Sequence, residues 1–484
     1  MTTGHNFWDA GVWSLMIELT ILLIAMLTAN MLRRLIKPLR QSLIPSSVMG
    51  GFLILIANIV YEKITGDALF SKVTMETLTY HGLGLGFVAM ALRSSKREKT
   101  KKSNTAVFDA GVTTVSSYLL QGILGLSITI GFFFLLGSWP ASGLLLPMGF
   151  GQGPGQAYNW GHIYETATAY APFRFGGSFG LTVAAMGFVS AGLGGVIYLH
   201  RIKKKGLVNP LLQSTDEEES LTTESISDKG EIPLSESLDK LTVQIGLVVL
   251  TYMAAYGVMY LISIGLDSLG GFFTSTVKPL IWGFNFLIGT VMAILVRNVL
   301  KGLTDRGRRQ YLNNFMLARV SGVMFDLMVV ASIAAINLTA FSHREFILPL
   351  LAVCIVGAVA TYLQLAFISK RLYPEYPHEA FLSLYGMLTG TASTGVILLR
   401  EIDPLFKTPA ANNLVYQQLW AIVFGFPMLL LLGYAPIGLT ANPATSNLTN
   451  TWVTLAALAV LFIVMNVILF RREIFGKKSK QISE

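Results

Sequence analysis

The chain has 484 residues, of which 53% are hydrophobic and only 13% are charged. Soluble globular domains carry about 25% charged residues, so the composition excludes an ordinary soluble domain and indicates a polytopic membrane protein. The formal net charge is +9, but the basic residues lie between apolar segments, and this placement argues against a nucleic-acid partner.

Apolar stretches of about 20 residues, the length that crosses a hydrocarbon core, recur along the chain. The N-terminal sequence MTTGHNFWDAGVWSLM lacks the basic region and the cleavage site of a signal peptide, so we expect the first span to stay in the mature protein. The predicted fold is all-α. We predict eleven spans, at residues 11–32, 46–61, 75–92, 106–136, 177–200, 241–264, 278–296, 315–337, 346–369, 416–433 and 452–470.

One long polar stretch divides the chain. Residues 206–240 are acidic and rich in Ser and Thr with few aromatics, a composition typical of a disordered linker, which we expect on the cytoplasmic side. Residues 1–205 then form a first repeat of five spans, and residues 241–433 form a second. Because five is odd, the second repeat starts on the opposite side of the membrane and is inverted. Residues 434–484 add a last span and a basic cytoplasmic tail.

Each repeat contains a segment that an ordinary membrane helix would not carry. The first is PMGFGQGPGQAYNWGHIYE at 147–165, with glycine at four alternate positions, and the second is LSLYGMLTGTASTGVILLREIDP at 382–404. A shift of 237 residues places Gly390 on Gly153. Backbone that leaves the helix at membrane depth is tolerated only where it is buried in protein or lines a cavity. The two segments therefore predict a cavity in the membrane interior, where the repeats meet.

The basic residues orient the chain. We expect residues 137–176 and 370–415 to be re-entrant, each dipping into the membrane and returning to the side it came from. The positive-inside rule then places the N-terminus outside and the C-terminus in the cytoplasm, in a plasma (inner) membrane. The basic clusters that this arrangement gathers on the cytoplasmic face lie near residues 33–40, 93–102, 201–205, 297–309, 370–371 and 471–480.

The polar groups beside the two breaks are the candidate substrate ligands. Short helices that begin near Ala157 and Val396 would aim free N–H groups and the positive ends of their dipoles into the cavity, and such ends suit a carboxylate. The alternative is that the polar side chains satisfy the broken backbone of their own turns. The predicted substrate-binding residues are Gly151, Gln152, Gly153, Gly155, Gln156, Asn159, Gly390, Thr391, Ser393 and Thr394.

Intramembrane ionisable and amide side chains give further candidates. Arg319, seven residues before Asp326 on one face of the eighth span, is predicted to bind a side-chain carboxylate of the substrate, with Asp326 as its resting partner or a cation ligand. The alternative has Arg319 reaching to the headgroups and Asp326 packed in the bundle. For Gln121 and Gln364, the alternative role is to form hydrogen bonds between helices. The candidate sodium ligands are Thr389, Thr391, Gln121 and Asp326.

The chemistry of these candidates favours ion-coupled transport over catalysis. Sodium is favoured over protons because the ligands are mostly carbonyl and hydroxyl oxygens. No cofactor is expected, since H-E-x-x-H is absent and the single Cys354 excludes a disulfide or paired-cysteine site. The sequence G-G-S-F-G at 176–180 fits a serine hydrolase elbow, but that motif follows a strand, and here it opens a membrane span. We expect no enzyme; an intramembrane enzyme using Ser178 and a channel are the alternatives from other classes.

Five stretches together resemble one known family. They are IPSSVMGGFL at 44–53, LGLGFVAMAL at 83–92, YLLQGILG at 118–125, the first glycine-rich segment, and GMLTGTASTGVILL in the second half. On these motifs residues 10–433 resemble the bacterial sodium/glutamate symporter family. The resemblance implies a sodium-coupled importer of glutamate or a related acid, built as two inverted five-span repeats with re-entrant segments, forming a homodimer and moving by an elevator-like shift.

The chain departs from that family at both breaks. The family's first loop reads G-G-H-G-T-A, where this sequence has GQGPGQ at 151–156, and the second reads G-A-T-P-T-A, where this sequence has GTASTG at 390–395. The glycines that shape the backbone are kept, whereas side chains that would discriminate between substrates differ. Import of another organic anion, or coupling to protons, therefore stays open as the alternative within the same class.

Overall fold

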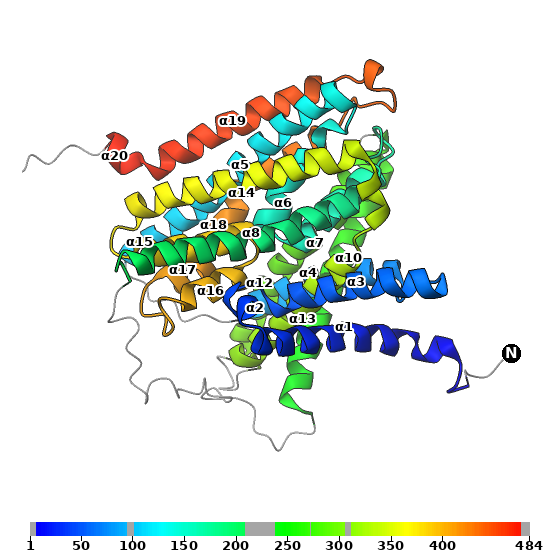
Figure 1. Ribbon diagram of the computed structural model, residues 1–484, viewed down its shortest axis with the longest axis horizontal. Helices are drawn as coiled ribbons and strands as arrows, with labels where there is room; N and C mark the ends of the chain where they lie inside the picture. The colour runs from blue at the N-terminus through cyan, green and yellow to red at the C-terminus, as the bar shows by residue number, and fades with distance from the viewer. Residues whose placement is uncertain (1–5, 94–100, 209–237, 272, 305–310, 476–484) are drawn as a thin grey trace, which may run out of the picture.

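The computed structural model describes residues 6–93, 101–208, 238–271, 273–304 and 311–475 (Figure 1). Every regular element in these ranges is a helix, so the predicted all-α class is confirmed. Most of the predicted linker, residues 209–237, lies outside the described residues, as do the parts of three predicted basic clusters at 94–100, 305–310 and 476–484.

Each of the eleven predicted spans overlaps a helix, but 278–296 falls on two, α11 (Lys278–Gly283) and α12, and fewer than eleven of the described helices have the length and apolarity of a span. Among the described residues, nine helices are long and apolar enough to cross a membrane, or ten if the pair α17 (Ala410–Tyr416) and α18, bent by 49°, counts as one span. The protein is therefore a polytopic membrane protein. The helices at the predicted spans are α1 (Ala10–Leu35), α3 (Ser46–Thr65), α4 (Lys72–Leu92), α5 (Lys101–Leu136), α8 (Gly176–Lys204), α10 (Lys240–Leu269), α12 (Asn285–Thr304), α13 (Asn314–Ala334), α14 (Arg344–Leu372), α18 (Gln418–Tyr434) and α19 (Thr449–Leu469).

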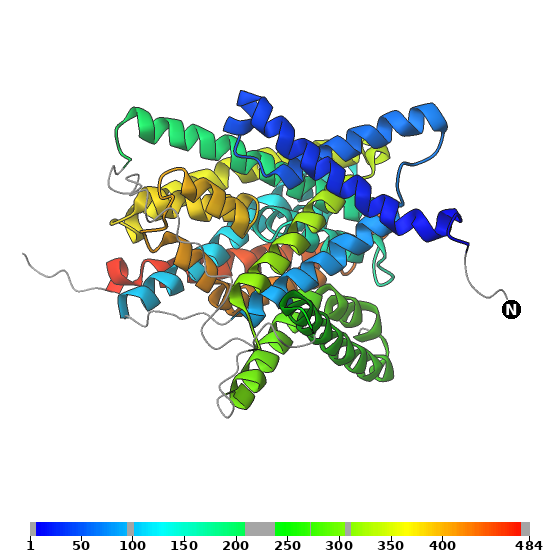
Figure 2. The ribbon, with the colours of Figure 1, turned by 90° about the horizontal axis from the view of Figure 1, so that it is seen from below.

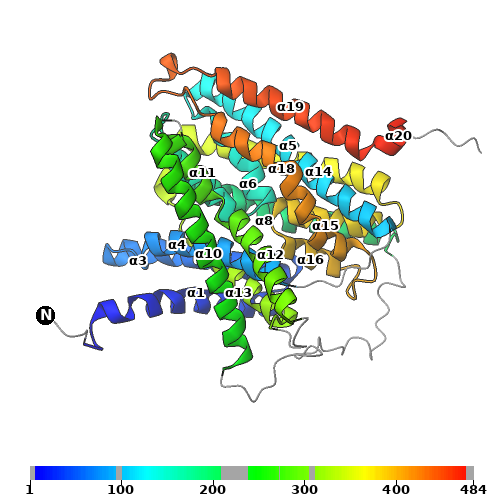
Figure 3. The same ribbon diagram turned by 180° about the vertical axis from the view of Figure 1, so that it is seen from behind.

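The helices pack as two bundles. The α4–α13 bundle consists of α1, α3, α4, α10, α12 and α13, and the α5–α14 bundle consists of α5, α8, α14, α17, α18 and α19 with the short helices of the two re-entrant segments. Figure 1 shows the first bundle below the second, and the view from behind in Figure 3 shows the same division. From below, α1 (dark blue) crosses in front of other helices, and α10 (dark green) lies at the lower edge of the view (Figure 2).

Each half of the chain contributes its first three long helices to the α4–α13 bundle and its later helices to the α5–α14 bundle. The third long helices of the two halves, α4 and α13, run antiparallel. In α4 and α13, a Cβ on Gly82 would meet Met328 Cβ at 3.0 Å, whereas further along α4 the carbonyl of Gly86 accepts a hydrogen bond from Ser321, nearer the start of α13. Inverted repeats require this opposite direction.

The first re-entrant segment enters and leaves at the same end of the bundle. The Trp139 indole donates a hydrogen bond to the carbonyl of Ala171 over 3.0 Å, and its ring stacks on Phe173 with centroids 5.0 Å apart. Between these contacts the chain forms η1 (Pro140–Leu144), α6 (Leu145–Gly151) and α7 (Pro154–Glu165). The start and the end of the excursion therefore lie together, as predicted for residues 137–176.

The second segment has the same form. It contains α15 (Pro377–Thr389) and α16 (Ala392–Arg400), which pack side by side because Gly386 and Gly395 face each other, so that a Cβ on Gly386 would lie 2.7 Å from Gly395 Cα. The Asn413 amide donates to the Tyr376 hydroxyl over 2.9 Å, which joins the end of the excursion to its start. This segment also returns to its side of entry.

The breaks are shorter than the glycine content predicts. In residues 147–165 only Gln152 and Gly153 leave the helix. Pro154 does not disrupt a helix here but starts one, because a proline at the first helical position lacks only an N–H that would have no partner there. The helices after the breaks begin at Pro154 and Ala392, earlier than the predicted starts near Ala157 and Val396.

Candidate functional site

The two breaks meet in the interior of the protein. Gly153 precedes α7 and Thr391 precedes α16, and a Cβ added to Gly153 would lie 3.3 Å from Thr391 Cγ2 and 3.7 Å from the carbonyl oxygen of Gly390. Residues far apart in the sequence, one from each half, thus form a single contact. We call these two segments the tips. The first tip is Gln152 and Gly153, and the second tip is Gly390 and Thr391.

Both tips present unpaired main-chain donors. Gly153 has φ 85° and ψ −179°, a conformation that glycine alone adopts readily. Neither α7 nor α16 has a side-chain cap, and the first intrahelical bonds are donated by Ala157 and Gly395. The amides before those positions, at 155–156 and at 392–394, therefore have no partner within their helices, and they carry the positive ends of the two dipoles.

A cavity of about 170 Å³ lies beside the tips, between the two bundles. Pro45 before α3, Met90 near the end of α4 and Gln418 at the start of α18 line its outer part. Basic residues gather at this end of α4 and α12, where the Arg297 guanidinium donates to the carbonyl oxygens of Ala91 and Arg93. The cavity thus extends from the tips towards the basic end of the helices. Of the predicted site residues, those that line it are Gly151, Gln152, Gln156, Asp326, Thr391 and Ser393.

Gln156 is the most informative of these residues. Its side chain is 1% exposed, and neither Nε2 nor Oε1 has a hydrogen-bond partner among the described residues. Leaving a buried polar group unsatisfied costs about 1–3 kcal/mol, so this amide at the cavity wall is a candidate ligand group. Gln152 is partly exposed and Ser393 is exposed, which leaves both accessible from the cavity.

The glycines on either side of the first tip serve packing. The Tyr118 hydroxyl donates to the carbonyl of Gly151 over 3.0 Å, and its ring occupies the space that a Cβ on Gly151 would need. A Cβ on Gly155 would lie 2.8 Å from Leu83 Cβ, so this glycine lets α7 approach α4 of the other bundle. Tyr118 was not predicted as a site residue, although it opens the YLLQGILG motif.

The threonines of the second tip are mostly satisfied within it. The Thr389 hydroxyl donates to the carbonyl of Tyr385 over 2.6 Å, the alternative role in which a side chain bonds its own helix. Thr394 is buried, and its hydroxyl lies 3.3 Å from that of Thr391. A Cβ on Gly390 would contact Phe188 Cδ1 at 3.1 Å. The oxygens nearest the tips that could hold a cation are therefore those of Thr391 and Thr394.

Two predicted amide ligands act between elements. Gln121 donates to the Thr361 hydroxyl over 2.9 Å and to the carbonyl of Leu388 over 3.0 Å, which joins α5 to α14 and α15. It does not line the cavity, so its geometry matches the alternative role of bonding between helices. Asn159 likewise donates to the carbonyl of Gly283 over 3.2 Å, although its Oδ1 has no partner among the described residues.

Arg319 lies away from the cavity, which corrects its predicted place. It is exposed near the start of α13, and its guanidinium lies 4.9 Å from the ring centroid of Phe315 on the same helix. A basic residue near a helix end extends to the surface in this way. Asp326, two turns further along α13, is also exposed, but it lines the cavity beside Ser47 of α3. The predicted pairing of the two residues at one site is therefore not supported.

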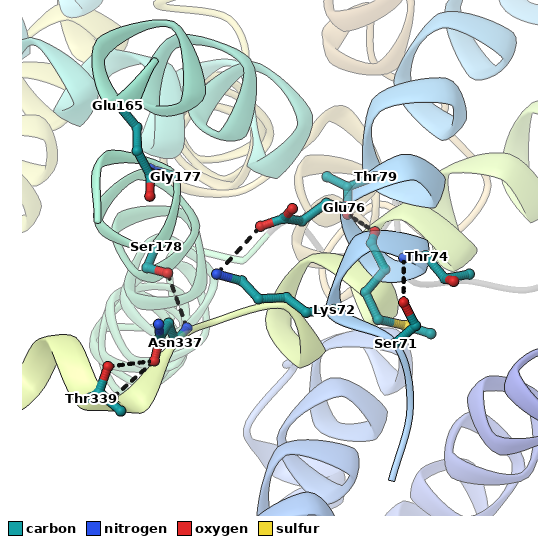
Figure 4. A network of polar contacts seen from close by, with 11 residues as sticks. Ser71, Lys72, Thr74, Glu76, Thr79, Glu165, Gly177, Ser178, Asn337 and Thr339 are labelled. Carbon is teal, nitrogen blue, oxygen red and sulfur yellow. Dashed lines mark hydrogen bonds and ion pairs between the residues drawn. The ribbon is translucent and has the colours of Figure 1, made fainter. Parts of the chain in front are cut away.

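At the opposite end of the helices, polar contacts form within α4 and between α8 and the loop after α13 (Figure 4). Lys72 forms a salt bridge with Glu76 one turn later on α4, over 3.5 Å. The Ser178 hydroxyl accepts a hydrogen bond from the main-chain N–H of Asn337 over 3.0 Å. Ser178 thus holds the loop that follows α13. The described residues before Gly176 form a loop and helices, without the strand that a hydrolase elbow requires.

No protein-family model and no curated protein matches this chain. What the fold and the site define is a class: an all-α polytopic membrane protein in which two re-entrant segments meet at an interior cavity. The resemblance to the bacterial sodium/glutamate symporters depends on the sequence motifs alone and stays a prediction.

Proposed function

We propose that the protein is a secondary transporter that imports a small carboxylate-bearing solute, such as glutamate or a related acid, together with sodium. The observation that carries the proposal is the meeting of two helix N-termini, one from each half of the chain, at the wall of one cavity between two bundles. Inverted-repeat transporters bind their substrates at such places.

The donors at the tips suit a carboxylate. Five main-chain amides, at 155–156 and 392–394, are free of intrahelical partners, and the buried amide of Gln156 adds a side-chain donor beside them. A carboxylate accepts several hydrogen bonds at once, and charge-assisted bonds are about twice as strong as neutral ones. Of these residues, Gln156, Ala392 and Ser393 line the cavity, and a solute carboxylate there would accept hydrogen bonds from their free donors.

The two bundles suit alternating access. The α5–α14 bundle carries both tips, whereas the α4–α13 bundle supplies the opposite wall, so a shift of one bundle against the other would move the solute from one side of the membrane to the other. This is an elevator-like movement, proposed for a homodimer in the plasma membrane with the N-terminus outside. The cavity extends towards the basic end, which corresponds to an inward-facing state under the positive-inside rule.

The alternative within this class is import of another organic anion driven by protons. It requires a carboxylate that changes its protonation during transport. Asp326 lines the cavity and is the residue placed for this role. Glu18, another intramembrane carboxylate, accepts a hydrogen bond from the Ser71 amide over 2.9 Å and thereby holds a loop. The sodium proposal instead uses the hydroxyl oxygens of the second tip.

The test is uptake by purified protein in proteoliposomes under an imposed sodium gradient. Labelled glutamate, aspartate, dicarboxylates and neutral amino acids are screened, and sodium-dependent accumulation of one of them is expected. Gly153→Leu should abolish uptake, whereas Gly246→Leu, at an open position on α10, should leave it unchanged. Accumulation that ignores sodium would reject the coupling, and loss of activity in Ser178→Ala but not in Gly153→Leu would favour an intramembrane enzyme.

A further inference from the structure

The cavity lining distinguishes between kinds of carboxylate. Among the described residues that line it, Asp326 is the only Asp, Glu, Lys, Arg or His. Glutamate carries a second carboxylate, and burying an ionised group without a partner costs several kcal/mol. The lining offers this group no cation and places a negative charge in the same cavity. A dicarboxylate is therefore poorly matched to the site.

The wall that faces the tips is apolar and aromatic. Phe87 of α4 packs against Phe286 of α12 with ring centroids 5.1 Å apart, and against Phe325 of α13 at 5.7 Å. All three line the cavity, and Phe87 and Phe325 are only partly buried. A solute that covers these rings with apolar surface gains about 25 cal/mol for each Å² removed from water, which a charged side chain would not.

Asp326 adds a requirement for positive charge. A solute that carried only a carboxylate would bring a second negative charge into the cavity. A solute with both a carboxylate and an ammonium group is neutral overall, and its ammonium can pair with Asp326 while its carboxylate faces the amides of the tips. The amide donors of the tips match a solute carboxylate, the Asp326 carboxylate matches an ammonium group, and the aromatic wall matches an apolar side chain.

We propose that the transported solute is an α-amino acid with an uncharged, apolar side chain, for which leucine serves as the probe, rather than glutamate. This inference rests on the proposed function and names its substrate. It assigns the carboxylate to Gln156 and the free amides of α7 and α16, the ammonium to Asp326, and the side chain to the wall formed by Phe87, Phe286 and Phe325.

Equilibrium binding to the wild-type protein in sodium-containing buffer tests separately the roles of the solute's carboxylate, ammonium group and side chain. The ligands are leucine, glutamate, leucinol, which lacks the carboxylate, and 4-methylpentanoate, which lacks the ammonium group. Because a hydrogen bond to a charged group contributes about 1.5–3 kcal/mol, leucine should bind at least about tenfold more tightly than each of the other three. Binding of glutamate equal to or tighter than that of leucine would overturn the inference.

A matched pair of variants tests the role of Asp326. Asp326→Asn should weaken leucine binding by about tenfold or more while leaving 4-methylpentanoate binding unchanged or tighter. Asp267→Asn, which removes a surface carboxylate paired with Lys278, should alter neither. Equal loss of both ligands in Asp326→Asn would assign Asp326 to folding and overturn its part in recognition.

Uptake distinguishes this inference from the proposed function. If sodium drives accumulation of glutamate but not of leucine, the transporter stands and the substrate class is wrong. If proteoliposomes accumulate none of the screened solutes, the proposed function fails and the inference fails with it.

Discussion

Replacing Gln156 by leucine should have opposite effects on stability and on binding. The Gln156 amide is buried and has no partner among the described residues, so the protein without solute carries an unsatisfied group that costs about 1–3 kcal/mol. Leucine has a similar size and no polar atoms. Gln156→Leu should therefore stabilise the solute-free protein by about 1–3 kcal/mol, and thermal unfolding of the purified protein measures this change.

The same substitution should weaken solute binding. A hydrogen bond from the amide to a carboxylate contributes about 1.5–3 kcal/mol, which corresponds to a loss of about 10- to 150-fold in affinity. Equilibrium binding of the solute to the same preparation measures it. The two effects have a common origin, since the amide is satisfied only when the carboxylate is present.

Gln121→Leu is the matched control. Gln121 is equally buried and its Oε1 also lacks a partner among the described residues, but its Nε2 donates to both Thr361 and Leu388. Its loss should lower stability, because two acceptors on neighbouring helices lose their donor. If Gln156→Leu lowers stability to the same extent as Gln121→Leu and leaves affinity unchanged, Gln156 is a structural residue and the assignment of the site is refuted.

Three further substitutions test the geometry of the tips. Gly153→Ala places a Cβ in a conformation that costs about 1–3 kcal/mol and should reduce transport at least tenfold, whereas Gly246→Ala should not; unchanged uptake would show that the first tip has another conformation. Tyr118→Phe removes the hydrogen bond to Gly151 and should destabilise the protein by about 1 kcal/mol, measured by unfolding; equal stability would contradict that contact. Arg319→Gln should leave solute affinity unchanged because Arg319 lies outside the cavity, and a tenfold loss would restore its predicted role.

The positions of the helices and of the two breaks could be predicted from the sequence because their signals are local. A run of about 20 apolar residues defines a span wherever it occurs. Glycine and proline interrupt helices through the residue's own backbone, so the tips at Gly153 and Gly390 were found from composition. The start of α7 lies earlier than predicted because Pro154 can stand at the first helical position, and glycine content alone cannot locate that position.

The faces of the helices could not be predicted in the same way. Arg319 and Asp326 are seven residues apart and therefore lie on the same face of α13. Which part of that face borders the cavity depends on how α3, α4 and α12 pack around it. The aromatic wall is formed by Phe87, Phe286 and Phe325, from three helices and both halves of the chain. In a sequence that is 53% hydrophobic, three phenylalanines give no signal until the fold brings them together.

The proposed transport function requires that the two tips meet at a solute site within the membrane. The most direct test is an electron cryomicroscopy map of the full chain in lipid nanodiscs with sodium and a transported solute. The account predicts a break at Gln152–Gly153 in contact with Thr391, and solute density whose carboxylate lies within hydrogen-bond distance of Gln156 or of the amides at 392–394. Continuous helices through both breaks, separated tips, or a solute bound elsewhere would contradict it.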